Sequence, residues 1–125
     1  TPIDESTIVA MFMNNRAAEN LVQGKLDEAY WWARAAIEHD NTFLLGYNTL
    51  ATIYQRRGDL GRAEQALRFA HRHDPANTVI LFNLAEVAAS VGKHADSAKF
   101  KAELARLEQA AAVSSLRQAL GLLPE

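Results

Sequence analysis

Histidines beside carboxylates are the residues of this chain that could bind a metal. The sequence contains His39-Asp40 and His73-Asp74, with His71 two positions before His73. Imidazole and carboxylate groups are common zinc ligands. However, His39 and His73 stand at matching points of two similar segments. Each falls at the expected end of a helix, where an imidazolium is stabilised by the helix dipole. We therefore expect no metal site and no cofactor.

The residue patterns that support catalysis are also missing. The 125 residues include no cysteine, which excludes a thiol nucleophile, a thiolate metal site and a disulfide within the chain. There is no glycine-rich phosphate loop and no Gly-x-Ser-x-Gly turn. The carboxylate pairs Asp4-Glu5 and Asp27-Glu28 fall in expected first turns of helices, where negative charge complements the dipole. We predict a chain with no catalytic residue, and not an enzyme.

Composition and charge exclude further classes of protein. Lysine and arginine number 13 against 15 acidic residues, so the net charge of −2 argues against a nucleic-acid-binding surface. No apolar run approaches the ~20 residues that span a bilayer, so we expect no direct membrane insertion. The chain has 23 alanines and 15 leucines but only three prolines and six glycines, which favours an all-helical fold. Because it begins with Thr1, we expect a processed or excised piece of a protein, and its localisation is not indicated.

A repeat organises the helices. The interval from Gly24 to Gly58 equals the interval from Gly58 to Gly92, and similar residues recur around each of these glycines. Between two of them, apolar side chains recur at helical spacing, and Gly58 is placed to end one helix. Asp59 is then a good N-cap for a second helix, which must stop before Pro75. The period therefore predicts two helices per unit.

The middle unit resembles a tetratricopeptide repeat, a family whose period of about 34 residues equals the interval between the glycines. The residues that carry the resemblance are Tyr47, Leu50, Ala51, Tyr54, Gly58, Ala63, Leu67, Ala70 and Pro75. The outer units depart from the pattern at Arg16, Asn20 and Asn41, and at Ala88, Gln109 and Ala98, the last being one position late. The resemblance implies an all-α, right-handed superhelical solenoid in one domain, 1–125. It consists of units at about 10–43, 44–77 and 78–109, a C-terminal capping helix and a tail at 110–125.

The resemblance also implies a concave groove, lined by the first helix of each unit, that binds a peptide or helix of a protein partner. The matching positions are Met11, Asn14, Leu21, Leu45, Asn48, Thr52, Gln55, Arg56, Val79, Phe82 and Glu86. The alternative for each apolar member is that it packs against a neighbouring helix. Trp31 lies among polar residues of its helix and is a second candidate anchor for a partner.

One partner class can be tested against the residues. Tetratricopeptide domains that bind the acidic C-terminal tails of heat-shock chaperones use lysine, arginine and asparagine side chains. The matching positions here are Asn14, Ala18, Thr49, Val79 and Asn83, none of which is a cation. Because a carboxylate needs charged or multiple donors to offset its desolvation, we expect that this chain does not bind such tails.

The C-terminal segment is unusually apolar. Leu116, Leu120, Leu122 and Leu123 follow one another before Pro124. We expect this segment to fold back onto the solenoid or to pack against another copy, which would make the chain a self-association module.

A finer resemblance suggests a further alternative. The strings that begin at Asn14, Ala29 and Tyr47 are similar to repeat segments that follow transglutaminase-like domains in some bacterial proteins. If so, the chain is a regulatory or targeting appendage of a larger bacterial enzyme.

Overall fold

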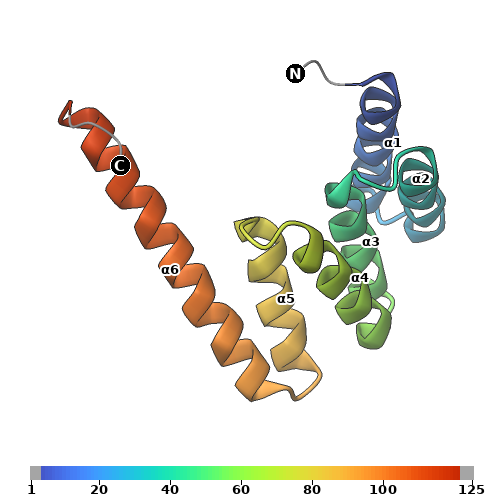
Figure 1. Cartoon of the computed structure of the whole chain (residues 1–125). Helices are drawn as coiled ribbons and strands as arrows, with labels where there is room; N and C mark the ends of the chain where they lie inside the picture. The colour runs from blue at the N-terminus through green and yellow to red at the C-terminus, as the bar shows by residue number, and fades with distance from the viewer. Residues whose placement is uncertain (1–3, 122–125) are drawn as a thin grey trace.

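The structure, a computed structural model, describes residues 4–121 and consists of helices and turns, without a strand in that range. The helices are α1 (Glu5–Val22), α2 (Leu26–His39), α3 (Leu44–Arg56), α4 (Leu60–His73), α5 (Thr78–Ser90) and α6 (His94–Ala119). Each unit is an antiparallel pair, and the three pairs stack one after another (Figure 1). The predicted all-α solenoid is confirmed.

The helices end where the sequence predicts. Gly24, Gly58 and Gly92 have positive φ angles of 76°, 79° and 84°, which only glycine adopts without strain. The turn after α3 is closed by the Asp59 N–H, which donates to the carbonyl of Tyr54 at 2.9 Å. The Asp59 carboxylate accepts a hydrogen bond from the Arg62 N–H and starts α4, as expected of an N-cap.

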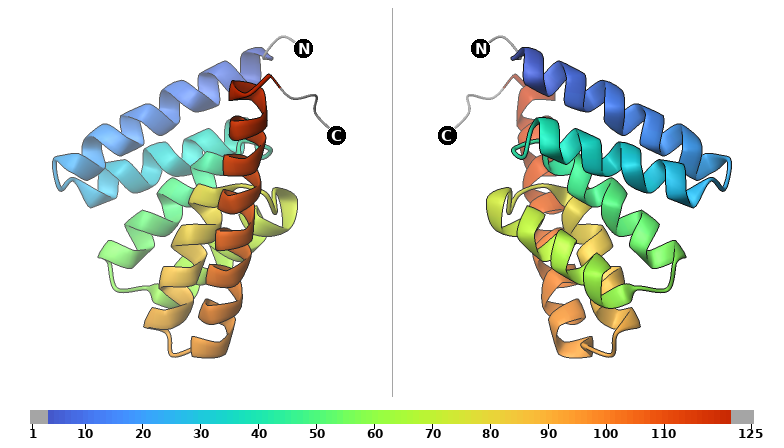
Figure 2. Two further views of the ribbon diagram at one scale, coloured as in Figure 1. Left: turned by 90° about the vertical axis from the view of Figure 1, so that its left-hand side faces the viewer. Right: turned by 90° about the vertical axis from the view of Figure 1, so that its right-hand side faces the viewer.

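Contacts between helices are local in the chain. Between units, α2 packs on α3 and α4 on α5. The backbones of the first helices also approach one another, α1 with α3 and α3 with α5, whereas those of α2, α4 and α6 stay apart in the described part of the chain. Views from either side show the same order of pairs (Figure 2). Because α1, α3 and α5 lie closer together than the second helices, the stack curves around them, and we call their exposed side the inner face.

Small residues allow the close packing. Ala29, Ala51, Ala63, Ala70 and Ala85 are at most 1% exposed. Two buried clusters result. The larger cluster spans the second and third units and consists of Ala51, Ala63, Leu67, Ala70, Ile80, Leu81, Leu84, Ala85, Val87, Ala88 and Phe100. The smaller cluster joins α1 and α2 to α3 and consists of Ala17, Leu21, Ala29, Ala33 and Ile53.

One position in the third unit was predicted wrongly. Ser97, not Ala98, is the small residue that packs inside the pair, and it stands one full repeat period after Ala63. Its hydroxyl donates to the Ala85 carbonyl at 2.9 Å, which satisfies the buried oxygen and makes serine acceptable there. Ala98 is exposed.

The end of the described chain is one long helix. The second helix of the third unit and the capping helix are a single element, because α6 continues unbroken for 26 residues, about twice the length of α4 with 14. Residues 110–119 extend this helix and do not fold back onto the solenoid. Leu122 and Leu123 lie outside the described residues.

Candidate functional site

An apolar ladder runs across the inner face. Met11, Leu45 and Val79 occupy the same repeat position, in the first turns of α3 and α5 and in the second turn of the longer α1. Their side chains are 40%, 43% and 53% exposed. Each first helix therefore presents a partly exposed apolar side chain at the same repeat position, and we call these three side chains the ladder.

The next row of the inner face mixes amides with an aromatic ring. The Asn83 amide donates to Oδ1 of Asn48 at 2.7 Å and links α5 to α3. Phe82 precedes Asn83 and is 53% exposed. Asn14 is partly buried, and its Oδ1 has no hydrogen-bond partner among the described residues. Phe82 is therefore the member of this row that offers most apolar surface.

The remaining predicted positions are polar. The Thr52 hydroxyl donates to the Asn48 carbonyl at 3.1 Å, and the Arg56 guanidinium donates to the Leu21 carbonyl at 3.0 Å. Gln55 is partly buried. Glu86 is exposed and is the single charged residue of α5. The predicted positions thus include one acidic side chain, Glu86, and one basic side chain, Arg56.

Leu21 was assigned to this surface wrongly. Its side chain is only 9% exposed and belongs to the smaller core cluster. The reason is that the last turn of α1 lies against the small side chains of Ala29 and Ala33 on α2, while Ile53 of α3 packs into the same cluster. The Leu21 carbonyl accepts hydrogen bonds from the Gly24 N–H at 3.1 Å and from the Arg56 guanidinium at 3.0 Å.

Trp31 lies on the outer side of the stack. It is 63% exposed, as predicted, and its ring meets that of Tyr30 edge-on at 5.3 Å. The Arg34 guanidinium lies over both rings, and its hydrogen bond to the Tyr30 hydroxyl lowers the pKa of that tyrosine. Trp31 and the inner face are thus separate surfaces.

The positions matched to the chaperone-tail clamp offer no charged donor. The Thr49 hydroxyl donates to the Leu45 carbonyl at 3.1 Å, and the Asn83 amide is bonded to Asn48. Ala18 and Val79 are exposed and apolar. A carboxylate placed here would lose water without gaining an ion pair.

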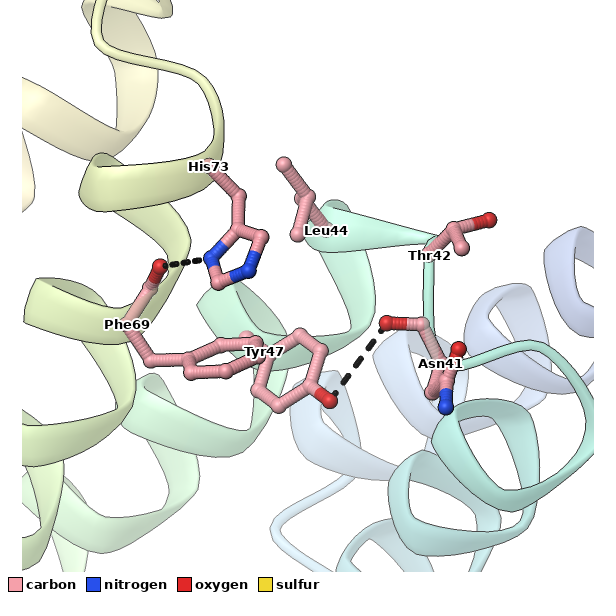
Figure 3. A pocket seen from close by; sticks show the side chains of 6 residues that line it. All are labelled: Asn41, Thr42, Leu44, Tyr47, Phe69 and His73. Atoms are coloured by element: carbon pink, nitrogen blue, oxygen red, sulfur yellow. Dashed lines mark hydrogen bonds between the residues drawn. The ribbon is translucent and has the colours of Figure 1, made fainter.

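A cavity of about 380 Å³ opens where α3 begins and α4 ends (Figure 3). Tyr47, Phe69 and His73 form one wall by ring stacking, with centroids 4.7 and 4.3 Å apart. Asn41, Thr42 and Leu44 line the rest. None of these residues was predicted to contact a partner. The His73 ring nitrogen is bonded to the Phe69 carbonyl at 2.9 Å, which accords with its expected role at a helix end.

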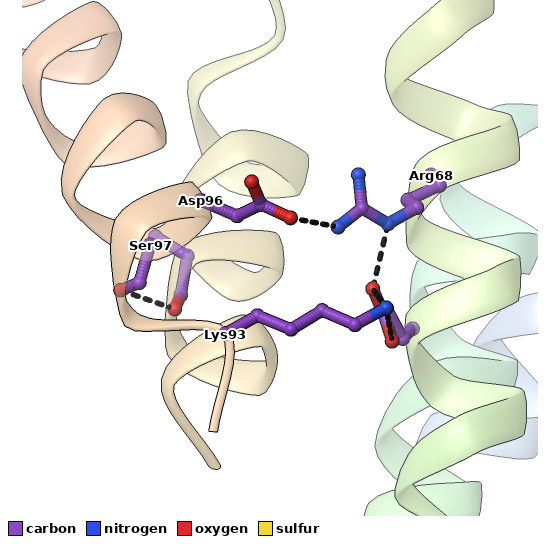
Figure 4. Close-up of polar contacts among 6 residues, drawn as sticks. Arg68, Lys93, Asp96 and Ser97 are labelled. Carbon is purple, nitrogen blue, oxygen red and sulfur yellow. Dashed lines mark hydrogen bonds and ion pairs between the residues drawn. The ribbon is translucent and has the colours of Figure 1, made fainter. Parts of the chain in front are cut away.

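A charged cluster fastens the second unit to the third (Figure 4). Glu64 is 7% exposed and accepts hydrogen bonds from Arg68 at 2.7 Å and from Lys93 at 2.8 Å. Arg68 reaches on to Asp96 at 3.0 Å. Burial by itself raises the pKa of Glu64, but the hydrogen bonds and charges of Lys93 and Arg68 outweigh it and hold the pKa below its ordinary value. This cluster is structural, since its groups satisfy one another.

Two further kinds of site were searched for in the described residues. Between residues 4 and 121, no three His, Asp or Glu side chains gather closely enough to bind a metal ion. No helix in the same range is both long and apolar enough to cross a membrane. Asp40, considered above with His39 as a ligand pair, instead accepts hydrogen bonds from Thr42 and Thr7, which lower its pKa.

The stacked pairs, the glycine-closed turns and the strip of exposed side chains on one side define a helical-repeat solenoid. No family model and no curated protein matches the sequence. Solved structures do match, and the three named next are tetratricopeptide-repeat domains or a chaperone of similar shape.

The first tetratricopeptide domain of Spaghetti (RPAP3), bound to the HSP90 peptide SRMEEVD, is 18% identical over 92% of this chain and 95% of that one, with a TM-score of 0.78. The Arabidopsis OM64 domain is 16% identical, covers 94% and 99%, and has a TM-score of 0.76. The Yersinia enterocolitica type III secretion translocator chaperone SycD is 19% identical over 88% of each chain, with a TM-score of 0.72. The chain therefore has the tetratricopeptide-repeat fold, as its residues predicted.

Proposed function

We propose that the chain is a non-catalytic protein-interaction scaffold whose inner face binds an apolar peptide or helix of a partner. The observation that carries the proposal is the ladder of Met11, Leu45 and Val79. Three half-exposed apolar side chains at one repeat position would remain in contact with water unless a partner covers them, and contiguous apolar surface of this kind marks interaction sites.

The polar groups around the ladder limit the kind of partner segment that can bind. The Thr52 hydroxyl donates to a backbone carbonyl and the Asn83 amide donates to Oδ1 of Asn48, so part of the hydrogen-bonding capacity of these side chains is used within the chain. Glu86 adds negative charge, and α5 has no lysine or arginine. Arg56 adds positive charge to the same set, so the apolar ladder and not net charge defines the partner that we propose, an apolar segment.

Peptides selected for binding to the wild-type chain from a displayed random library test the proposal. The variant Leu45→Lys/Val79→Lys should bind selected apolar peptides at least about tenfold more weakly, because two rungs of the ladder are lost. Trp31→Lys is the matched control, since it changes an equally exposed apolar side chain on the outer side. If only Trp31→Lys loses binding, the site lies on the outer side. If Leu45→Lys/Val79→Lys binds as well as Trp31→Lys does, the ladder has no role in binding.

The chain's membership of a larger, transglutaminase-like bacterial enzyme stays a prediction from sequence strings. The full-length reading frame decides it.

A further inference from the structure

The cavity between the start of α3 and the end of α4 is large for a domain of this size. Its volume is about 380 Å³. Packed interiors contain few voids larger than a water molecule, whereas pockets of about 300–1,000 Å³ bind small molecules. The cavity is therefore large enough for one aromatic side chain or for a small molecule of similar size.

The ring-lined wall of this cavity is not a requirement of the repeat. Tyr47, Phe69 and His73 stack in one column, with ring centroids 4.7 and 4.3 Å apart. The same repeat positions hold Met13, Ala35 and His39 in the first unit, and Leu81, Glu103 and Leu107 in the third. Of the three units, only the middle one has a ring at each of these positions, although all three form the same helix pair. The column therefore needs an explanation other than the fold.

His73 is held so that one of its ring nitrogens faces the cavity. Its Nδ1 lies 2.9 Å from the Phe69 carbonyl. A carbonyl oxygen only accepts hydrogen bonds, so Nδ1 carries a proton and donates it. In the neutral ring Nε2 is then an acceptor, and no residue in the described range 4–121 bonds to it. Nε2 lies on the side of the ring nearer to Leu44 and Tyr47 (Figure 3).

No strongly charged side chain lines the cavity. None of its six lining residues is an aspartate, glutamate, lysine or arginine. Asp40 follows α2 beside the lining, but its carboxylate already accepts hydrogen bonds from Thr7 and Thr42. Asp74 likewise accepts one from the Asn77 amide. A charged ligand would lose water here without gaining a free opposite charge from these groups, so the cavity favours a neutral one.

The hydroxyl groups of the lining leave Nε2 of His73 as the acceptor for a ligand. The Tyr47 hydroxyl donates to the Asn41 carbonyl at 3.5 Å, and the Thr42 hydroxyl donates to Asp40 at 2.6 Å. Aromatic rings add to one another in offset-stacked or edge-to-face contacts. A flat ring with an N–H or O–H at its edge therefore matches both the column and the acceptor.

We propose that this cavity is a binding site for a neutral aromatic group that carries a hydrogen-bond donor, namely an indole or a phenol. The ring packs between Leu44 and the column, and its N–H or O–H donates to Nε2 of His73. The site goes beyond the proposed function, because none of its lining residues belongs to the ladder.

Titration of the 125-residue chain with indole at pH 8, followed by two-dimensional NMR, tests the proposal. Signals of the residues that line the cavity should shift together, with a Kd of about 1 mM or below. 1-Methylindole keeps the ring but has no N–H, and it should bind at least about fivefold more weakly. Shifts confined to other surfaces, such as that around Trp31, would overturn the proposal, and so would equal affinities for the two compounds.

A substitution at His73 isolates the acceptor. His73→Phe keeps a ring in the column but removes Nε2, so the ratio of the affinities for indole and 1-methylindole should fall to about one. His39→Phe is the matched control, because His39 is also exposed, holds the same repeat position and lies outside the cavity. It should keep the wild-type ratio. An unchanged ratio in His73→Phe would overturn the role of Nε2, and circular dichroism checks that both variants remain helical.

Two further ligands define the chemistry and its source. Indole-3-acetate adds a carboxylate and should bind more weakly than indole, whereas tighter binding would overturn the preference for a neutral ligand. The blocked tripeptide Gly-Trp-Gly presents the same ring on a peptide backbone. Binding within about threefold of indole would assign the site to a tryptophan side chain of a partner, and weaker binding would assign it to a small molecule. Failure of indole to bind leaves the ladder and its peptide test unaffected.

Discussion

Replacing Glu64 with glutamine should weaken the joint between the second and third units. The substitution keeps the shape of the side chain but removes the charge that Arg68 and Lys93 face. A hydrogen bond to a charged group is worth about 1.5–3 kcal/mol. Here the side chains of Arg68 and Lys93 are 33% and 51% exposed, so water replaces much of the stabilisation that each cation loses with the carboxylate charge. Desolvation of the carboxylate is also relieved in the variant.

The net loss in the free energy of unfolding should therefore be about 1–2 kcal/mol at neutral pH, well below the full value of two charged hydrogen bonds. Urea denaturation followed by circular dichroism measures it. Glu108→Gln, an exposed change on α6, is the control and should stay within about 0.5 kcal/mol of wild type. Hydrogen exchange should show faster opening of α5 and α6 than of α1 and α2 in the Glu64 variant.

The pH dependence has a definite sign. The folded-state pKa of Glu64 lies below its unfolded value, so the carboxylate's contribution is complete above the unfolded value of about 4.3. It disappears as the pH falls from there through the folded pKa. The difference between wild type and Glu64→Gln should therefore close in acid. Equal stability at neutral pH, or a difference that grows on acidification, would refute the reasoning.

Three further predictions concern stability, each measured by urea denaturation. Gly58→Ala should lower the free energy of unfolding by about 1–2 kcal/mol because φ is +79°. Gly61→Ala, inside α4, should raise it by about 0.5–1 kcal/mol, because the added Cβ meets only Oδ1 of Asp59, at 4.0 Å; opposite signs would contradict the reasoning. Ile53→Ala removes a fully buried side chain between the first two units and should cost about 2–5 kcal/mol, so a smaller loss would mean that the joint collapses to fill the space. Asn77→Ala removes the N-cap of α5, whose side chain accepts from the N–H groups of Val79 and Ile80, and should cost about 1 kcal/mol; no change would show that water replaces the cap.

The repeat itself could be predicted from the chain because its markers are chemically strict. A glycine with positive φ and a buried alanine between close helices have few substitutes, so Gly24, Gly58 and Ala63 reveal the period. Serine can replace the small alanine at this position, but the sequence pattern did not show it. Ser97 fits there because its hydroxyl donates a hydrogen bond to the Ala85 carbonyl.

The departures in the first unit have a reason that only packing shows. Arg16 stands where the later units have Leu50 and Leu84, and Leu84 is fully buried. In the described residues no earlier unit covers Arg16, which instead pairs with Glu19 and lies over the Trp32 ring. Within the described residues, the surroundings of Arg16 are therefore a salt bridge and a ring contact and not the packing between units.

The candidate site stays a prediction, but the structure shows which of its residues are accessible. Met11, Leu45 and Val79, which the repeat period assigns to one position, are exposed. The repeat period could not show that Leu21 is buried, because its burial depends on the side chains that α2 and α3 bring to the same cluster. It also missed the ring-lined cavity beside Tyr47, since that cavity arises where several segments meet.

The short reach of the helix contacts has a consequence for how the chain folds. Each contact in residues 4–121 joins helices that are neighbours or next neighbours in the sequence, so only short loops must close. Folding of such topologies is fast, and it can start in any unit and spread. During synthesis the pair of α1 and α2 can form while later residues are still being added. Val79, on α5, is added after the helices that carry Met11 and Leu45, and of the six described helices α6 is made after the other five.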